Sequence, residues 1–161
     1  MQKTTYLLTL AGCLLLSCTA FSQDFIPAYD RFSGKETSYI TLENGTKLEG
    51  TLEDLDRRKG LIEEVVIKDA TGKKITLKPD QIKSMYLMPS GLSKLSTNMD
   101  VGTKVKKWDA QYIDSEIIKK GYAYFEKAKV VLKKDREMLL MQLLNPGFNS
   151  KIKVFHDPFA A

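Results

Sequence analysis

The chain has 161 residues, of which 25 are basic and 20 acidic, so its formal net charge at pH 7 is +5, and 43% of its residues are hydrophobic. This length can bury a core without disulfide bonds, since single domains commonly have about 100–150 residues. Beyond the N-terminal segment, no stretch approaches the roughly 20 consecutive apolar residues that span a bilayer. We therefore expect a mature protein that is not transmembrane.

Residues 1–22 have the three-part layout of a secretory signal peptide. Lys3 supplies the positive start, residues 6–18 form an apolar run, and Ala20-Phe21-Ser22 is a cleavage site of the small-residue type. We expect cleavage after Ser22 and a periplasmic or secreted location.

The alternative is a lipoprotein anchored through Cys13 or Cys18. Leu10-Ala11-Gly12-Cys13 resembles a bacterial lipobox, although only about five apolar residues precede Cys13, where a signal core has roughly 7–15. Cys18 is better placed, but it follows a large leucine. Because both cysteines lie in the signal segment, the mature chain forms no disulfide and cannot supply a zinc site of several soft or imidazole ligands.

The basic surplus lies in the C-terminal half of the chain. From Lys94 onward there are 13 basic and 8 acidic residues. Such a surplus favours acidic polymers or anionic lipid surfaces, although an ordinary solvated, lysine-rich surface is the simpler interpretation.

Residues 38–92 have the pattern of a β-meander or small barrel of five short strands, preceded by a lead-in at 23–37. Ile40 and Leu42 alternate with polar residues, and Asn44-Gly45 predicts a hairpin because both turn positions need positive φ. The next strand continues through Leu48, Gly50 and Leu52, further strands are predicted at 62–67, 75–77 and 82–88, and a charged loop is predicted at 56–60. A sheet this small must close into a barrel or pack on another element.

Residues 93–120 are predicted to be a linker and one short helix. From Trp108 to Lys120 apolar residues recur at helical spacing, and Gly121 stands at the stop.

The segment 121–161 is predicted to be β-rich. Within 122–144 we favour two strands joined by a loop at 133–136, although the helix formers of 127–144 leave a helix as the alternative. Residues 151–155 alternate like a further strand. The chain then ends without a capping element, so we expect it to be truncated at the C-terminus. The predicted fold class is mainly β, with one short helix between the meander and the later hairpin strands.

The run from Leu42 to Asp56 resembles the first motif of Sm-like small β-barrels. Those proteins show a strand, an Asn-Gly or Asp-Gly turn, and a strand bent at glycine, which Gly50 matches. Residues 78–82 fall where the second motif would be, but they lack the basic-glycine pair that shapes the family's RNA pocket. The resemblance implies a small barrel more than it implies RNA binding.

The C-terminal run from Gly121 through Asn145-Pro146-Gly147 to Phe155 is similar to uncharacterised exported proteins of Gram-negative envelopes. That resemblance implies a location and no activity.

The sequence yields no catalytic, cofactor-binding or metal residues that we would assign. His156 is the only histidine, and no Gly-x-Ser-x-Gly elbow supplies a nucleophile for it. The carboxylate clusters Asp54-x-Asp56 and Glu63-Glu64 lack the ligand number of a calcium loop.

Nucleic-acid binding needs basic residues interleaved with stacking aromatics. Tyr122, Tyr124 and Phe125 lie near Lys120 and Lys127 in the sequence, but aromatics in a strand usually pack across it, so we expect no nucleic-acid partner.

The predicted function is therefore that of an exported, non-enzymatic envelope protein that binds a protein partner or a surface polymer through its sheet. One alternative is an Sm-like RNA-binding protein, if the chain is cytoplasmic. The other is a carboxylate-dependent enzyme that uses Asp54, Asp56 and Glu64.

Overall fold

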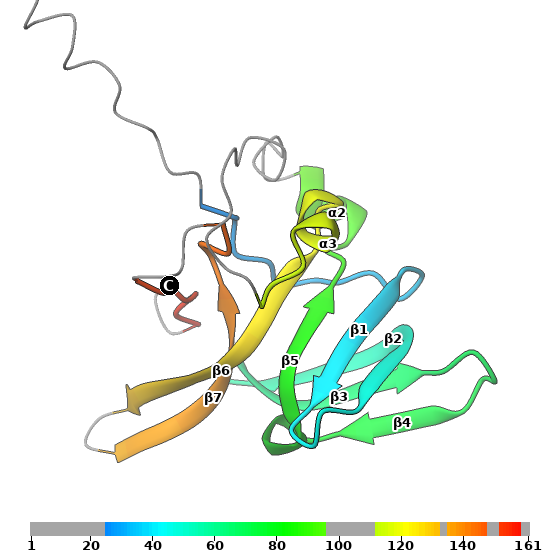
Figure 1. Ribbon diagram of the computed structural model, residues 1–161, viewed down its shortest axis with the longest axis horizontal. Helices are drawn as coiled ribbons and strands as arrows, with labels where there is room; N and C mark the ends of the chain where they lie inside the picture. The colour runs from blue at the N-terminus through cyan, green and yellow to red at the C-terminus, as the bar shows by residue number, and fades with distance from the viewer. Residues whose placement is uncertain (1–24, 96–111, 133–134, 148–151, 159–161) are drawn as a thin grey trace, which may run out of the picture.

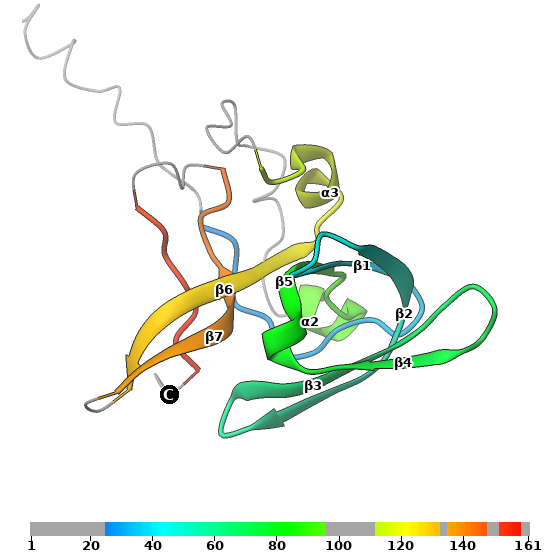
Figure 2. The same cartoon turned by 60° about the horizontal axis from the view of Figure 1, so that its bottom comes forward.

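A computed structural model describes residues 25–95, 112–132, 135–147 and 152–158. Within them, seven strands form one antiparallel sheet in the order β4-β3-β2-β1-β5-β6-β7, which curls into a half-barrel (Figures 1 and 2). The elements are β1 (Thr37–Leu42), β2 (Lys47–Arg58), β3 (Leu61–Lys68), β4 (Lys74–Leu77), the 3₁₀ turn η1 (Pro79–Gln81), β5 (Ile82–Leu87), α2 (Gly91–Leu95), α3 (Ser115–Lys119), β6 (Ala123–Leu132) and β7 (Asp135–Leu143). The fold is mainly β, as the sequence predicts.

The strands β1 to β4 form the predicted meander, because each pairs with the next along the chain. The hairpin predicted at Asn44-Gly45 is confirmed, but only Gly45, with a φ of 85°, has the positive φ expected of both turn positions. The Asn44 side chain instead accepts a hydrogen bond from the Thr46 backbone at 2.9 Å. The predicted charged loop at 56–60 is wrong in extent. Residues 56–58 pair with β3 as part of β2, and only Lys59 and Gly60 make the turn, both with positive φ.

The fifth strand does not extend the meander beyond β4. The turn η1 redirects the chain, and β5 pairs with β1 on the other side of the sheet. This order is compatible with the small β-barrel that the resemblance implies. The sheet then continues outward from β5 through β6 to β7.

The two strands predicted within 122–144 are confirmed, and the helical alternative is wrong. The predicted loop at 133–136 is wrong in extent, because Asp135 and Arg136 already pair with β6 as part of β7. Strands β6 and β7 pair in register from Tyr124↔Leu143 to Leu132↔Asp135. The helix formers here are overridden because the sheet and the segments that pack on it bury side chains on both faces of this hairpin near the body of the protein, as at Tyr124 and Phe125.

Three predictions after the meander need correction. Helix α2 begins at Gly91, where no helix is predicted. In the described part of the predicted 108–120 helix, only Ser115–Lys119 is helical, because the Asp114 side chain caps the backbone N–H groups of Glu116 and Ile117 and so fixes the start. Residues 152–155 form no strand, and only Phe155 makes an isolated bridge.

The segment forms no strand because it is held by one side chain and two backbone hydrogen bonds rather than by a continuous ladder; the Leu144 N–H donates to the Val154 carbonyl, and the His156 N–H donates to the Gln142 carbonyl. Asn145 is buried, and its amide donates to the Ile152 carbonyl at 2.6 Å and accepts from Val154 at 2.7 Å. A single bridge, Leu143↔Phe155, joins the segment to β7. The predictions for residues 1–22, including Cys13 and Cys18, and for 96–111 lie outside the described residues.

The main core fills the inner face of the half-barrel and draws on all seven strands. The predicted lead-in is tied into this core. Gln142 of β7 accepts a hydrogen bond from the Tyr29 backbone at 3.0 Å and donates to the Pro27 carbonyl at 2.8 Å. The Phe32 ring packs edge-on against Phe125 at 5.6 Å. No helix in the described ranges is long and apolar enough to cross a membrane.

Candidate functional site

A groove of about 500 Å³ lies on the outer face of the sheet, opposite the main core. It crosses from β2 over β1 and β5 to β6, and α3 forms one wall. Three strand spacings correspond to about 14 Å. We call this the outer groove; its lining residues are Tyr39, Ile40, Thr41, Lys47, Leu48, Glu49, Lys83, Ser84, Tyr86, Tyr112, Asp114, Ile117, Tyr124 and Glu126.

Strand register explains why tyrosines gather in the outer groove. Tyr39 of β1 pairs with Tyr86 of β5, and Tyr86 pairs with Tyr124 of β6. Cross-strand partners share a face, so these three tyrosines form a ladder across the sheet. The Tyr86 and Tyr124 rings lie 4.9 Å apart at a tilt of 50°.

A second, polar ladder runs beside the tyrosines. Lys47 pairs with Thr41, Thr41 with Ser84, and Ser84 with Glu126. The inward neighbours along these strands, such as Ile40 and Phe125, belong to the core, so the period-two alternation of each strand places these polar residues on the outer face.

The α3 wall is attached through Tyr86. The Tyr86 hydroxyl accepts a hydrogen bond from the Asp114 backbone N–H at 2.8 Å, and Asp114 also caps α3. Beneath the helix, Ile118 and Ile113 pack with Tyr124 and Leu143 in a second, smaller core. Burial raises the pKa of the Tyr86 and Tyr124 hydroxyls above the usual tyrosine value.

The β6 end of the outer groove carries a buried acid. Glu126 is only 7% exposed, and its carboxylate lies 2.8 Å from the Lys153 ammonium, which sits 5.0 Å from the centre of the Tyr112 ring. Burial alone would lower the pKa of Lys153, but its contacts with Glu126 and Tyr112 raise it above the ordinary value. Lys153 therefore stays charged and neutralises Glu126.

Other charged groups of the outer groove are available to a ligand. Lys47, Glu49 and Lys83 form no ion pair with any residue that the structure describes. Such groups, beside tyrosine rings and hydroxyls, can bind a ligand that has both polar and apolar parts.

The carboxylates considered as catalytic candidates lie elsewhere, on β2 and β3. Asp56 pairs with Glu64 across the two strands, whereas Asp54 pairs with Val66 and accepts a hydrogen bond from the neighbouring Leu55 backbone. Glu64 contacts the Lys78 ammonium at 2.7 Å, and this hydrogen bond raises the pKa of Lys78. The structure thus brings two of the three together on an exposed strand pair outside the outer groove. Their neighbour Glu63 faces Arg58 at 3.8 Å.

His156 lies by a second, much smaller cavity of about 20 Å³, comparable with the space of one water molecule. Arg57 also lines this cavity, and its Nε is buried without a hydrogen-bond partner. Arg57 approaches Asp30 at 3.5 Å and lies 5.7 Å from the Phe32 ring centre. Burial lowers the pKa of this guanidinium, but no nucleophile lines the cavity beside His156.

The aromatic and basic cluster around 120–129 is divided between the two faces of the sheet. Tyr124 lines the outer groove, Phe125 packs in the core, and Lys127 pairs with Glu43 at 2.6 Å. The Tyr122 ring packs against the Tyr39 ring with the ring centres 5.7 Å apart at a tilt of 55°. These aromatics pack within the protein, so they do not form a continuous base-stacking surface.

Comparison with models of known protein families finds no match, and neither curated proteins nor solved structures yield one. The class of the protein is therefore defined by its fold alone, as a curled antiparallel sheet compatible with a small β-barrel.

Sequence reasoning missed the outer groove because its residues come from five segments. A partial signal was present: Tyr39 alternates with Ile40, and Tyr86 with Met85 and Leu87, which places the tyrosines on the face opposite the core. Only the pairing of β1 with β5 brings them together.

Proposed function

We propose that the protein is an exported, non-enzymatic module of the cell envelope that binds a protein partner or surface polymer in the outer groove. The observation that carries the proposal is the grouping of Lys47, Glu49 and Lys83, which form no ion pair within the described part of the chain, beside the tyrosine ladder. The signal-like segment 1–22 supports the location.

The chemistry of the outer groove supports binding rather than covalent catalysis. Ser84 is the only serine of the lining, and its hydroxyl interacts with Tyr124 rather than with an imidazole. A groove about 14 Å across fits about four residues of an extended peptide, at roughly 3.3 Å per residue. Its mixed charges suit a polar chain better than a lipid.

The test is site-specific photocrosslinking in whole cells that carry the tagged full-length chain. A photoreactive amino acid at Lys83 places the probe in the outer groove, and the same amino acid at Lys73, in the exposed β3–β4 turn, is the matched control. Cell fractionation of the same cultures checks the location. A protein partner gives one discrete product from position 83, and a polymer gives a ladder.

Thr41→Arg provides the second arm, because it places a long side chain in the outer groove, and Thr76→Arg on the exposed face of β4 is its control. We expect Thr41→Arg to remove the product and Thr76→Arg to leave it. Products of equal yield from positions 83 and 73, or a protein found only in the cytoplasm, would contradict the proposal.

A further inference from the structure

The free end of the β6–β7 hairpin projects from the body of the protein (Figures 1 and 2). On the side continuous with the inner face of the sheet it carries Lys129 and Val131 of β6, and Arg136 and Met138 of β7. We call these four side chains the hairpin face. They share a face because the core residues Phe125 and Leu140 occupy the same alternating positions of the two strands.

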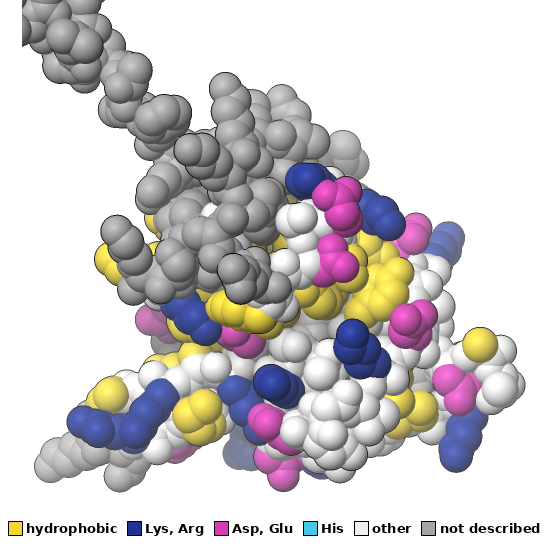
Figure 3. Space-filling view, viewed as in Figure 1, with side chains coloured by type: hydrophobic (Ala, Val, Ile, Leu, Met, Phe, Trp, Pro, Cys, Tyr) yellow, Lys and Arg dark blue, Asp and Glu magenta, His cyan; other side chains and the backbone are white. Residues whose placement is uncertain are grey.

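The hairpin face alternates cation and apolar group in both directions. Lys129 pairs with Met138, and Val131 pairs with Arg136, so each cation has an apolar partner across the strands and another along its own strand. Val131 is 63% exposed and Met138 58%, which places them among the most exposed large hydrophobic residues described. Figure 3 shows basic and hydrophobic side chains together on this end of the hairpin.

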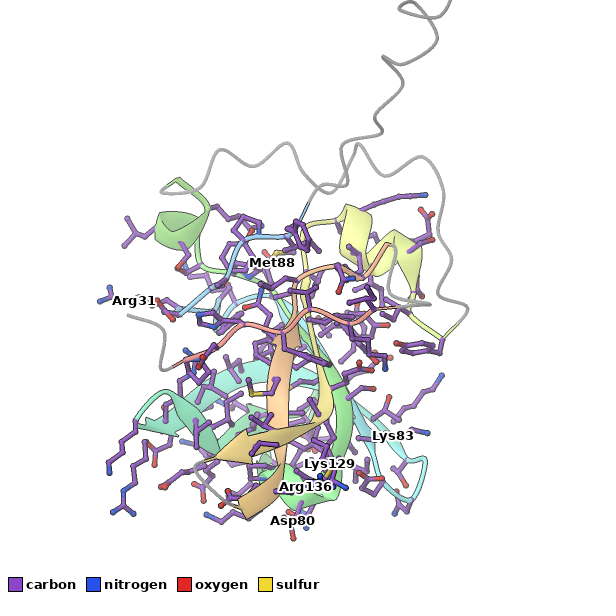
Figure 4. The ribbon with its side chains drawn as sticks, turned by 90° about the vertical axis from the view of Figure 1, so that its left-hand side faces the viewer. Arg31, Asp80, Lys83, Met88, Lys129 and Arg136 are labelled. Carbon is purple, nitrogen blue, oxygen red and sulfur yellow. The ribbon has the colours of Figure 1, made fainter. Side chains whose placement is uncertain are left out.

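The two cations carry net charge. Lys127, one step nearer the core, is neutralised by Glu43 at 2.6 Å. Lys129 and Arg136, which Figure 4 shows at the free end of the hairpin, form no ion pair with any described residue. They also belong to the half of the chain that holds the basic surplus.

We propose that the hairpin face binds the surface of a bilayer that contains anionic lipids. Lys129 and Arg136 contact the phosphate groups, while Val131 and Met138 enter the boundary between headgroups and acyl chains. Such an interface offers negative charge and an apolar medium within a few ångströms of each other.

Other occupants fit only half of this pattern. A soluble acidic polymer would pair with the cations but leave Val131 and Met138 in water. An apolar protein surface would cover the two apolar side chains and bury two unpaired charges, which is costly.

The test is co-sedimentation of the full-length chain with vesicles of phosphatidylcholine alone or mixed with phosphatidylglycerol. The measured quantity is the ratio of the partition coefficients on the two vesicles, which removes the contribution that residues 1–22 make to both. Two variants act on the hairpin face: Lys129→Glu with Arg136→Glu, and Val131→Ser with Met138→Ser. The control, Lys35→Glu with Lys120→Glu, makes the same charge change at exposed positions outside it.

We expect the hairpin charge variant to lower the ratio at least about 30-fold, because each basic side chain lost from an anionic surface costs about fivefold and the two glutamates add repulsion. The control should lower it less than about threefold, since its charges lie farther from the surface than a Debye length. The serine variant should lower partition into the mixed vesicles about fivefold or more, through lost apolar burial. Circular dichroism confirms that each variant is folded.

Three results would overturn the proposal. The native chain could partition equally onto both vesicles, or the control could lower the ratio of partition coefficients as much as the hairpin charge variant does. The serine variant could bind the mixed vesicles as well as the native chain does, which would mean that an acidic surface of any kind suffices; binding to soluble polyglutamate would then identify a polymer instead.

Discussion

Replacing Gly50 by alanine tests whether β2 and β3 lie so close because Gly50 has no side chain. A Cβ at this position would stand 2.5 Å from the backbone oxygen of Lys68 and 3.0 Å from its carbonyl carbon. Both atoms are backbone, so no change of rotamer can relieve the contact. The strand β3 must move instead, and it carries Val65 and Ile67, which are fully buried in the core.

The expected loss of stability is about 1–2 kcal/mol. Overpacking of this kind costs about 1–3 kcal/mol. Alanine also lowers the conformational entropy of the unfolded chain, which stabilises the folded state by about 0.4–1 kcal/mol. Gly91→Ala is the matched control, because a Cβ there meets nothing within 4 Å and Gly91 has no positive φ. It should gain the entropic term without the clash.

Urea unfolding followed by circular dichroism measures both variants, and an unchanged m-value shows that the comparison is valid. The two variants should therefore differ in sign. If Gly50→Ala unfolds within about 0.5 kcal/mol of the native chain, or if Gly91→Ala loses as much stability, the close approach of the two strands does not depend on the glycine.

The outer groove leads to two further predictions. Burial raises the pKa of Tyr86 and Tyr124, so the stability that these groups contribute should be fully present below about pH 10 and should fall as the pH rises further and unfolded tyrosines ionise. Tyr124→Phe should make this fall shallower when the free energy of unfolding is measured against pH. An unchanged slope would contradict the assignment. Lys153→Met leaves the buried Glu126 carboxylate without its cation and should cost about 1–3 kcal/mol of stability at pH 7. Adding Glu126→Gln to the same chain should restore part of that stability. If thermal unfolding shows no recovery, the aliphatic part of the Lys153 side chain, rather than its charge, stabilises the fold.

The meander was predictable because its signals are local. Asn44-Gly45 and Asp69 to Gly72 fix their turns with positive φ and side-chain hydrogen bonds to nearby backbone groups, and Asp69 accepts bonds from both Thr71 and Lys73. Pairing of β5 with β1 was not predictable, since Tyr39 and Tyr86 are far apart in the sequence and no local pattern indicates that they pair. The outer groove depends on that pairing.

The attachment of the segments at 25–33 and 152–158 was not predictable for a different reason. Each is held by a few backbone hydrogen bonds and by one buried amide, Gln142 or Asn145, that bonds to the backbone of the residue opposite. Backbone groups are the same in every residue, so such attachment requires no particular hydrophobic period in the attached segment. The alternation at 151–155 therefore predicts a strand where only an isolated bridge forms, and 23–37, which has no period, gives no sign that it is attached to the sheet.

The hydrogen bond between Gln142 and Pro27 joins residues that the ribosome makes at very different times. Pro27 lies 115 residues earlier in the chain, and a ribosome that adds about 5–20 residues each second makes the two about 6–23 s apart. For most of that interval Phe125 and Leu140 are still to be made, so the apolar inner face of the meander lacks two of the core residues that cover it. The nascent chain therefore presents a hydrophobic surface for seconds before it can close, long enough for a chaperone to bind it first.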